Sequence, residues 1–206
     1  QQMKVAYAAR NVFGVSRVVW SGERQAWQIW HGTTIHGIQA ASGARRLQPV
    51  AYYGPLKEVI AALPASLTKE PMAVLGMGAG TIACYAKPKQ VVQFYEIDPL
   101  VNRIAHDERF FTYLKDCPGE SKISMGDGRI GILQEEDHRF GLIVGDAFSS
   151  DSIPMHLMTK EAVEIYFDKL KAGGMIAFNV SSRHLNLLPV LSAIAQEVGA
   201  HGVWQR

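Results

Sequence analysis

The feature that most constrains the fold of this chain is a regular alternation, from residue 56 onward, of short apolar runs with segments that favour helices. Strands and helices in strict rotation form a parallel sheet that is covered by helices on both faces. In such sheets a ligand binds at the carboxyl ends of the strands, where the strand order reverses. The runs that we expect to be strands cover residues 72–76, 91–98, 122–127, 141–146 and 175–181.

Three segments between these runs carry helix signals. PLKEVIAALP at 55–64 predicts a helix with Val59, Ile60 and Leu63 facing inward. A second helix is expected to begin near Pro99, because proline is favoured in a first turn. Thr159 can cap a third helix, which should end at the glycine pair 173–174. Its apolar residues recur every three or four positions, at Ala162, Val163, Tyr166, Phe167 and Leu170.

The first quarter of the chain has a different texture. Short alternating runs such as VFGVSRVVW and RQAWQIWHGTTIHG are separated by turn formers, which predicts antiparallel strands with tryptophans in cross-strand pairs. We therefore predict an α/β fold: a Rossmann-like, doubly wound, mostly parallel sheet with a small N-terminal antiparallel β unit. The expected division is a β-strand unit over residues 1–55 and a nucleoside-binding catalytic domain over 56–206.

Composition narrows the function classes. With 206 residues and 48% hydrophobic content the chain can bury a substantial core, and its net charge of +2 gives no strong field toward nucleic acid. A small-molecule partner is therefore expected. Cys84 and Cys117 show no CxxC spacing, so we expect two reduced thiols and no metal. We expect the chain to be cytoplasmic, alone or as the soluble domain of a longer, membrane-attached protein.

The segment AVLGMGAGTIACY at 73–85 joins an apolar strand to glycines and a helix start. Small residues at this junction let a ligand approach backbone N–H groups near the positive end of a helix. The pattern is GxGxG, with Thr81 where the dinucleotide fingerprint needs a glycine. This favours a nucleoside without phosphates over a pyrophosphate. The expected binding residues here are Gly76, Gly78 and Gly80.

Acidic residues follow several of the expected strands. Glu96 lies twenty residues after Gly76, where a carboxylate accepts hydrogen bonds from ribose hydroxyls, and Asp98 follows it. Asp127 could accept a bond from the exocyclic amine of adenine. Each acid could instead be a helix cap. Carboxylates gathered on one rim repel one another, however, so they need cations or hydrogen-bond donors nearby. A positively charged sulfonium nucleoside would supply both. The remaining acids of the series are Asp146 and Asp151.

Two histidines, His31 and His36, invite a metal interpretation. A separation of five residues in one strand would place them on opposite faces, so we expect one to be buried and the other exposed.

Taken as a set, several segments resemble the spermidine synthases and their bacterial spermidine synthase-like relatives, within the class I S-adenosylmethionine-dependent transferase fold. The resemblance runs from about Arg17 to Val198, and its segments are HGTTIHGIQ, YYGP, GMGAGT, FYEIDP, GDGR and DAFSSDSIP. It implies that Gln39 approaches the nucleoside and that Tyr52 and Tyr53 line a polyamine pocket. It also assigns Glu96 to the ribose, Asp127 and Gly128 to the adenine side, and the catalytic acid to the loop with Asp146 and Asp151.

The chain departs from the family pattern at three places. Ala79 stands where typical spermidine synthases have an aspartate that would hold the amine of decarboxylated S-adenosylmethionine. His36 replaces the aspartate of Asp-Gly-x-x-Gln, and the loop DAFSSD is two residues longer than Asp-Ser-Ser-Asp. A lost carboxylate changes the charge preference of the site, which makes intact S-adenosylmethionine a second candidate co-substrate.

Three hypotheses follow for the function. The first is an alkyl transferase of the EC 2.5.1 type that moves an aminopropyl group from decarboxylated S-adenosylmethionine to a diamine such as putrescine. The second is methyl transfer to a small molecule, and the third is a non-catalytic nucleoside-binding module. Asp146 or Asp151 would be the base or the electrostatic anchor of the amine substrate, and a tyrosine from 52–53, with Tyr53 the catalytic candidate, would help position the amine. By resemblance we also expect a homodimer.

Overall fold

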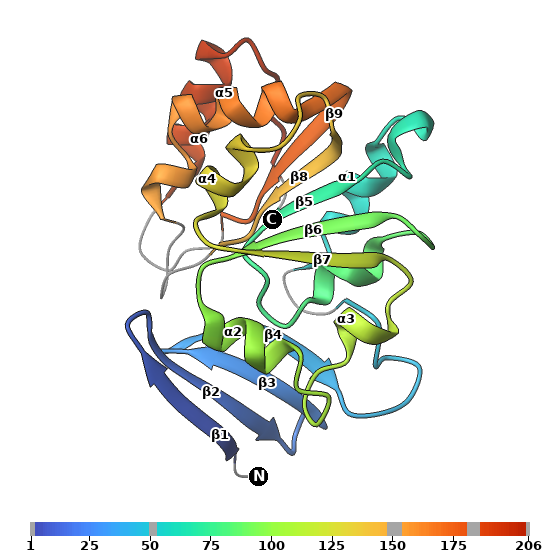
Figure 1. The fold of residues 1–206 in the computed structure, drawn as a ribbon, viewed down its shortest axis with the longest axis vertical. Coiled ribbons are helices and arrows are strands. Elements are labelled where there is room, and N and C mark those ends of the chain that lie inside the picture. The colour runs from blue at the N-terminus through green and yellow to red at the C-terminus, as the bar shows by residue number, and fades with distance from the viewer. Residues whose placement is uncertain (1–2, 50–52, 148–153, 181–185, 205–206) are drawn as a thin grey trace.

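A computed structural model of the chain describes residues 3–49, 53–147, 154–180 and 186–204 (Figure 1). Within these residues the strands form a four-stranded sheet of order β1-β2-β3-β4 and a five-stranded sheet of order β7-β6-β5-β8-β9. The larger sheet is parallel throughout. The predicted fold class is confirmed: a Rossmann-like parallel sheet with a small N-terminal antiparallel sheet.

The N-terminal sheet is a meander of β1 (Lys4–Asn11), β2 (Gly14–Ser21), β3 (Ala26–His31) and β4 (Thr34–Ala40). Trp20 and Trp27 face each other across β2 and β3, with ring centroids 5.0 Å apart, so the expected cross-strand pairing of tryptophans is confirmed for these two. Trp27 also packs edge-on against Phe110, at 5.0 Å, which joins this sheet to the rest of the molecule.

The parallel sheet begins at its centre with β5 (Met72–Leu75) and grows outward on one side, then on the other. The order reverses between β5 and β8, and this reversal sets the place of a ligand site at the carboxyl ends of those two strands. Its other strands are β6 (Val91–Glu96), β7 (Glu120–Met125), β8 (Phe140–Gly145) and β9 (Leu170–Phe178).

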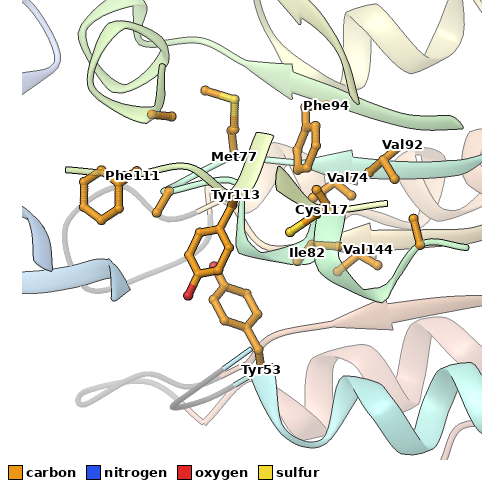
Figure 2. Packing of buried hydrophobic residues seen from close by; sticks show 14 of the residues in the cluster. Tyr53, Val74, Met77, Ile82, Val92, Phe94, Phe111, Tyr113, Cys117 and Val144 are labelled. Carbon is orange, nitrogen blue, oxygen red and sulfur yellow. The ribbon is translucent and has the colours of Figure 1, made fainter. Parts of the chain in front are cut away.

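Alternate residues of the central strands enter two separate cores. Val74 and Phe94 belong to the first, which also contains Tyr53 and Tyr113 (Figure 2). Their neighbour Leu75 belongs to the second, on the opposite face of the sheet. Burial on both faces explains why the strands are near-continuous apolar runs rather than alternating patterns.

Short helices connect the strands (Figure 1). The helix expected at 55–64 is α1, and the one expected near Pro99 is α2. The full set comprises α1 (Leu56–Ala62), η2 (Ala65–Leu67), η3 (Thr81–Tyr85), α2 (Pro99–Ala105), α3 (Tyr113–Asp116), α4 (Gly128–Leu133), η4 (Met155–Leu157), α5 (Lys160–Lys169) and α6 (Leu188–Glu197).

The expected end of the third helix was wrong. Thr159 caps α5 as predicted, its side chain accepting a bond from the backbone N–H of Ala162, but the helix ends at Lys169 rather than at the glycine pair. Leu170, which the periodicity placed on the helix, instead opens β9 and pairs with Phe140. Pairing with β8 therefore overrides the helical pattern from Leu170 onward. The register between β8 and β9 shifts between Phe140 and Leu142, and Gly173, with φ of 81°, lets β9 follow this irregularity.

The N-terminal sheet is joined to the parallel-sheet unit through β4. The side chain of Gln39 is 2% exposed; its Oε1 accepts a bond from the backbone N–H of Thr112, and its Nε2 donates to the hydroxyl of Thr112. The hydroxyl of Tyr113 donates to the carbonyl of Ile38. The division into units 1–55 and 56–206 stays a prediction.

The expectation of two reduced thiols was wrong, because Cys84 and Cys117 form a disulfide. The pair is 33 residues apart in sequence and joins η3 to the end of α3, so only the tertiary fold brings the two together. The cysteines therefore no longer support the expectation of a cytoplasmic chain. No helix within the described residues combines the length and apolar character that a membrane span requires.

Candidate functional site

The glycine loop follows β5 at the point where the strand order reverses. Gly76 and Gly78 have φ of 92° and 54°, in the left-handed region that other residues rarely adopt. A Cβ atom on Gly76 would lie 2.7 Å from the carbonyl oxygen of Asp146, and one on Gly78 would lie 2.2 Å from that of His36. Both glycines are therefore required, because the backbone after β8 and that of β4 press against the loop.

A pocket opens beside this loop, at the carboxyl ends of β5, β6, β7 and β8. Three parts of the chain far apart in sequence contribute its walls: the N-terminal sheet, the ends of the parallel strands, and the segment around η4. The lining residues are Phe13, His31, His36, Leu75, Gly76, Met77, Gly78, Tyr95, Glu96, Ile97, Asp98, Val101, Gly126, Asp127, Gly128, Asp146, Ala147, Pro154, His156 and Leu157.

Glu96 ends β6 and supports the glycine loop. Its Oε2 accepts a bond of 3.0 Å from the backbone N–H of Met77, and its Oε1 accepts one of 2.8 Å from that of Asp98. Burial raises the pKa of Glu96 above its ordinary value, while these two bonds lower it. Asp98 caps α2, its Oδ1 accepting from the N–H of Leu100 and from the side-chain amide of Asn11 at 2.5 Å.

Asp127 lies two residues beyond the end of β7 and caps α4. Its Oδ1 accepts bonds from the backbone N–H groups of Arg129 and Ile130, at 2.9 and 3.0 Å. Its Oδ2 lies 2.7 Å from Nε2 of His156. Burial raises the pKa of Asp127, but the bonds from Ile130, His156 and Arg129 outweigh it and hold that pKa below its ordinary value.

Asp146 follows β8 and faces the reversal of strand order. The hydroxyl of Tyr53 donates to its Oδ2 at 2.9 Å, and the side-chain amide of Asn179 donates to its Oδ1 at 2.8 Å. Burial raises the pKa of Asp146 from 3.8 to about 6, in spite of these two bonds, which lower it. A carboxyl group with this pKa is largely ionised at neutral pH and still basic enough to take a proton.

The structure brings most of the sequence-predicted site residues into this pocket. Those that line it are Gly76, Gly78, Glu96, Asp98, Asp127, Gly128 and Asp146. Asp98 and Asp127 also cap helices. Each of them is therefore both a helix cap and a residue that lines the pocket. Their binding roles stay predictions.

Other predicted residues lie outside the pocket wall. Among the described residues, Gln39 is buried in bonds to Thr112, and Gly80 lies under Leu114, whose Cδ2 would be 2.6 Å from an added Cβ. Tyr53 is 4% exposed and reaches the site through its hydroxyl. Tyr52 and Asp151 lie outside the described residues.

The expected placement of the two histidines on opposite faces was wrong. A turn at Gly32, with φ of 58°, folds the stretch back, so His31 ends β3 while His36 lies on the neighbouring β4. Their rings pack edge to face with centroids 5.6 Å apart, and both line the pocket. Within the described ranges, no group of three or more His, Cys, Asp or Glu side chains is arranged to hold a metal ion.

Ala79 is fully buried and does not face the pocket. It packs under β4, where a Cβ atom added to Gly37 would lie 2.5 Å from the Cβ of Ala79. In the structure, position 79 therefore has no space for a carboxylate. His156 and Phe13 were missed by the sequence reasoning: both line the pocket, yet neither stands in a motif that points to a ligand.

Comparison with known proteins finds relatives among the polyamine aminopropyltransferases. No family model matches the sequence. The chain is 28% identical over 136 residues to a polyamine aminopropyltransferase of Vibrio vulnificus, and 24% identical over 184 residues to a probable polyamine aminopropyl transferase of Bifidobacterium longum. Those matches cover 64% and 87% of this chain.

The fold is also similar to that of solved proteins. A probable spermidine synthase from Corynebacterium glutamicum has a TM-score of 0.68 at 19% identity, over 86% of this chain and 64% of that one. The spermidine synthase of Thermotoga maritima has a TM-score of 0.65 at 14% identity, over 95% and 63% of the two chains. The chain is similar in sequence to polyamine aminopropyltransferases and similar in fold to spermidine synthases.

The chain spans less than half the length of each of these two curated relatives. The matched residues span 44% of the Vibrio protein and 38% of the Bifidobacterium protein. At their level of identity, the solved structures establish the fold of this chain and not its reaction.

Proposed function

We propose that this chain transfers an aminopropyl group from decarboxylated S-adenosylmethionine to an amine such as putrescine. The observation that carries the proposal is Asp146: a carboxyl group with a pKa of about 6, held by Tyr53 and Asn179 at the reversal of strand order. The names of the curated relatives, both polyamine aminopropyltransferases, support the same reaction.

In the proposed step, the lone pair of the amine attacks the aminopropyl carbon bound to sulfur. A C–N bond forms, the C–S bond breaks and its electron pair returns to sulfur, so that neutral 5′-methylthioadenosine leaves. The attacking nitrogen must be deprotonated, and Asp146 takes the proton at Oδ1 or Oδ2. The Tyr53 hydroxyl, 2.9 Å from Oδ2, holds the carboxylate in place and so orients the amine that bonds to it.

The donor nucleoside would lie over the glycine loop. Glu96 would accept bonds from the ribose hydroxyls, in addition to the bond of its Oε2 with the backbone N–H of Met77. Asp127 would accept a hydrogen bond from the exocyclic amine of adenine. The lining carboxylates at 96, 98, 127 and 146 create a negative field, which favours a cationic sulfonium and a protonated amine over anionic ligands.

Methyl transfer from intact S-adenosylmethionine is the second candidate. It is favoured by Ala79, because no carboxylate at that position attracts an ammonium group or repels a carboxylate. The burial of Ala79 under Gly37 weakens this argument, since position 79 does not face the ligand. Aminopropyl transfer therefore remains the preferred proposal, and a nucleoside-binding module without activity is the alternative outcome of the test.

The test is incubation of the protein with putrescine and each sulfonium nucleoside in turn, followed by mass spectrometry. We expect 5′-methylthioadenosine and an aminopropylated amine from decarboxylated S-adenosylmethionine. S-adenosylhomocysteine from the intact nucleoside would replace the proposal by methyl transfer. Neither product, from a chain that still binds a nucleoside, would favour the non-catalytic module. Asp146→Asn is the matched control, because it keeps the shape of the side chain and removes the base.

A homodimer formed through the N-terminal sheet belongs to the same proposal. Strand β1 is an edge of that sheet, and hydrophobic side chains on or beside it are exposed: Met3 at 60%, Val5 at 52% and Val12 at 93%. Light scattering during gel filtration should give twice the mass of the chain. A monomer at micromolar concentration would contradict this part of the proposal.

A further inference from the structure

His156 stands at the end of the pocket where the proposed function places the base of the nucleoside. Its Nε2 lies 2.7 Å from Oδ2 of Asp127, and its side chain is 50% exposed. The backbone beneath it is fixed: Leu157 is buried, and its carbonyl accepts a bond from the hydroxyl of Tyr166. The imidazole can therefore change its position while the backbone of η4 stays in place.

The hydrogen-bonding capacity of Asp127 is limited. Each carboxylate oxygen offers about two acceptor sites. The two sites of Oδ1 are used by the N–H groups of Arg129 and Ile130, so this oxygen is committed to capping α4. Oδ2 already accepts from His156. An amino group of a base can therefore bind Asp127 only at Oδ2, where it must share the oxygen with the imidazole or replace it.

We propose that His156 is a latch on the base subsite, whose bond to Asp127 competes with the amino group of an incoming adenosyl compound. The proposal rests on the proposed function, because that function assigns Asp127 to the base. The latch weakens binding of the nucleoside when it is closed. It also keeps the Asp127 carboxylate paired while the pocket is empty, and this pairing offsets the cost of removing water from the carboxylate.

The strength of this latch depends on the charge of the imidazole. Histidine side chains change charge between pH 5 and 8, and a charged imidazolium holds a carboxylate more tightly than a neutral ring. Among the residues that the structure describes, charged or titratable groups near the pair include Arg129 of α4 and Glu161 and Tyr166 of α5. Arg129 donates to the carbonyl of His156. Lower pH should therefore close the latch.

The test is calorimetric titration with 5′-methylthioadenosine, a neutral ligand, at pH 5.5 and pH 8. We expect the wild type to bind two- to fivefold more weakly at pH 5.5, on the scale of an exposed charged pair. His156→Ala should bind more tightly than the wild type at pH 5.5 by about the same factor, and the part of the pH dependence that His156 causes should be lost. His156→Gln can still donate a neutral bond, so it should lose that part as well.

The control is His106→Gln, at the exposed C-cap of α2, where Nδ1 of His106 contacts the carbonyl of Asn102. It should behave as the wild type does. Titration of Asp146 affects all variants alike, so the difference between variants isolates His156. Weaker binding by His156→Ala at both pH values, or an unchanged pH dependence, would overturn the latch alone. No binding of the nucleoside to the wild type would overturn the proposed function, and the latch with it.

Discussion

Replacing Asp146 by asparagine should stabilise the folded protein at neutral pH while it abolishes turnover. Burial raises the pKa of Asp146 from 3.8 to about 6, so the folded state holds this proton more tightly than the unfolded chain does. The contribution of Asp146 to stability is therefore greatest below pH 4 and is lost as the pH rises to about 6. Asparagine carries no charge and avoids this loss.

The magnitude follows from the size of the shift. A pKa that moves from 3.8 to about 6 corresponds to about 3 kcal/mol, at roughly 1.4 kcal/mol for each pH unit. Water reaches the pocket, so we expect about 2–3 kcal/mol in practice. The hydrogen bonds survive the substitution: an asparagine carbonyl can accept from Asn179, and its amide can donate to the hydroxyl oxygen of Tyr53.

The assay is urea unfolding of the wild type and of Asp146→Asn at pH 4 and pH 8. The free energy of unfolding of the variant relative to the wild type should rise by about 2–3 kcal/mol between the two pH values. Tyr53→Phe should enlarge the pH dependence, because it removes a bond that lowers the pKa of Asp146. A difference between variant and wild type that does not change with pH would refute the reasoning.

Three further predictions concern other parts of the molecule. Cys84→Ser combined with Cys117→Ser should lower the free energy of unfolding by about 3–4 kcal/mol, from the entropy of a loop closed across 33 residues, and urea unfolding with and without reductant checks this. Ala79→Asp should cost about 3–5 kcal/mol, because it places an unpaired charge under Gly37, and a gain in affinity for decarboxylated S-adenosylmethionine would contradict that placement. Asp151→Asn should abolish turnover and leave nucleoside binding nearly intact, because it removes the predicted electrostatic anchor of the amine substrate; lost binding in calorimetry, or unchanged turnover, would reject that role.

Patterns within short segments of the sequence were enough to predict the parallel sheet and several residues at the carboxyl ends of its strands. The apolar runs and the glycine loop place Gly76 and Glu96 at the carboxyl ends of neighbouring strands, and the structure has both in one pocket. Their spacing reflects a βαβ unit, which is encoded within about thirty consecutive residues. Such features can be predicted because they depend on near neighbours in the sequence.

What could not be predicted depends on contacts between distant residues. The Cys84–Cys117 disulfide needs η3 and α3 to lie side by side, and no cysteine spacing indicates this. His31 and His36 meet only because a turn separates them, which a single-strand interpretation misses. Ala79 likewise packs under Gly37, which is a contact between the glycine loop and β4 of the N-terminal sheet. Neither segment carries a sequence pattern that indicates this contact.

These distant contacts together make the N-terminal sheet a structural part of the candidate site. The carbonyl of His36 lies against Gly78, Gly37 covers Ala79, and Asn11 donates to the cap residue Asp98. Every one of these contacts acts on the glycine loop or on the rim of the pocket. A loop with left-handed glycines has many alternative conformations when it is free, so these neighbours restrict its conformation. Under the proposed function, the antiparallel sheet would therefore favour binding by ordering the loop before the ligand arrives.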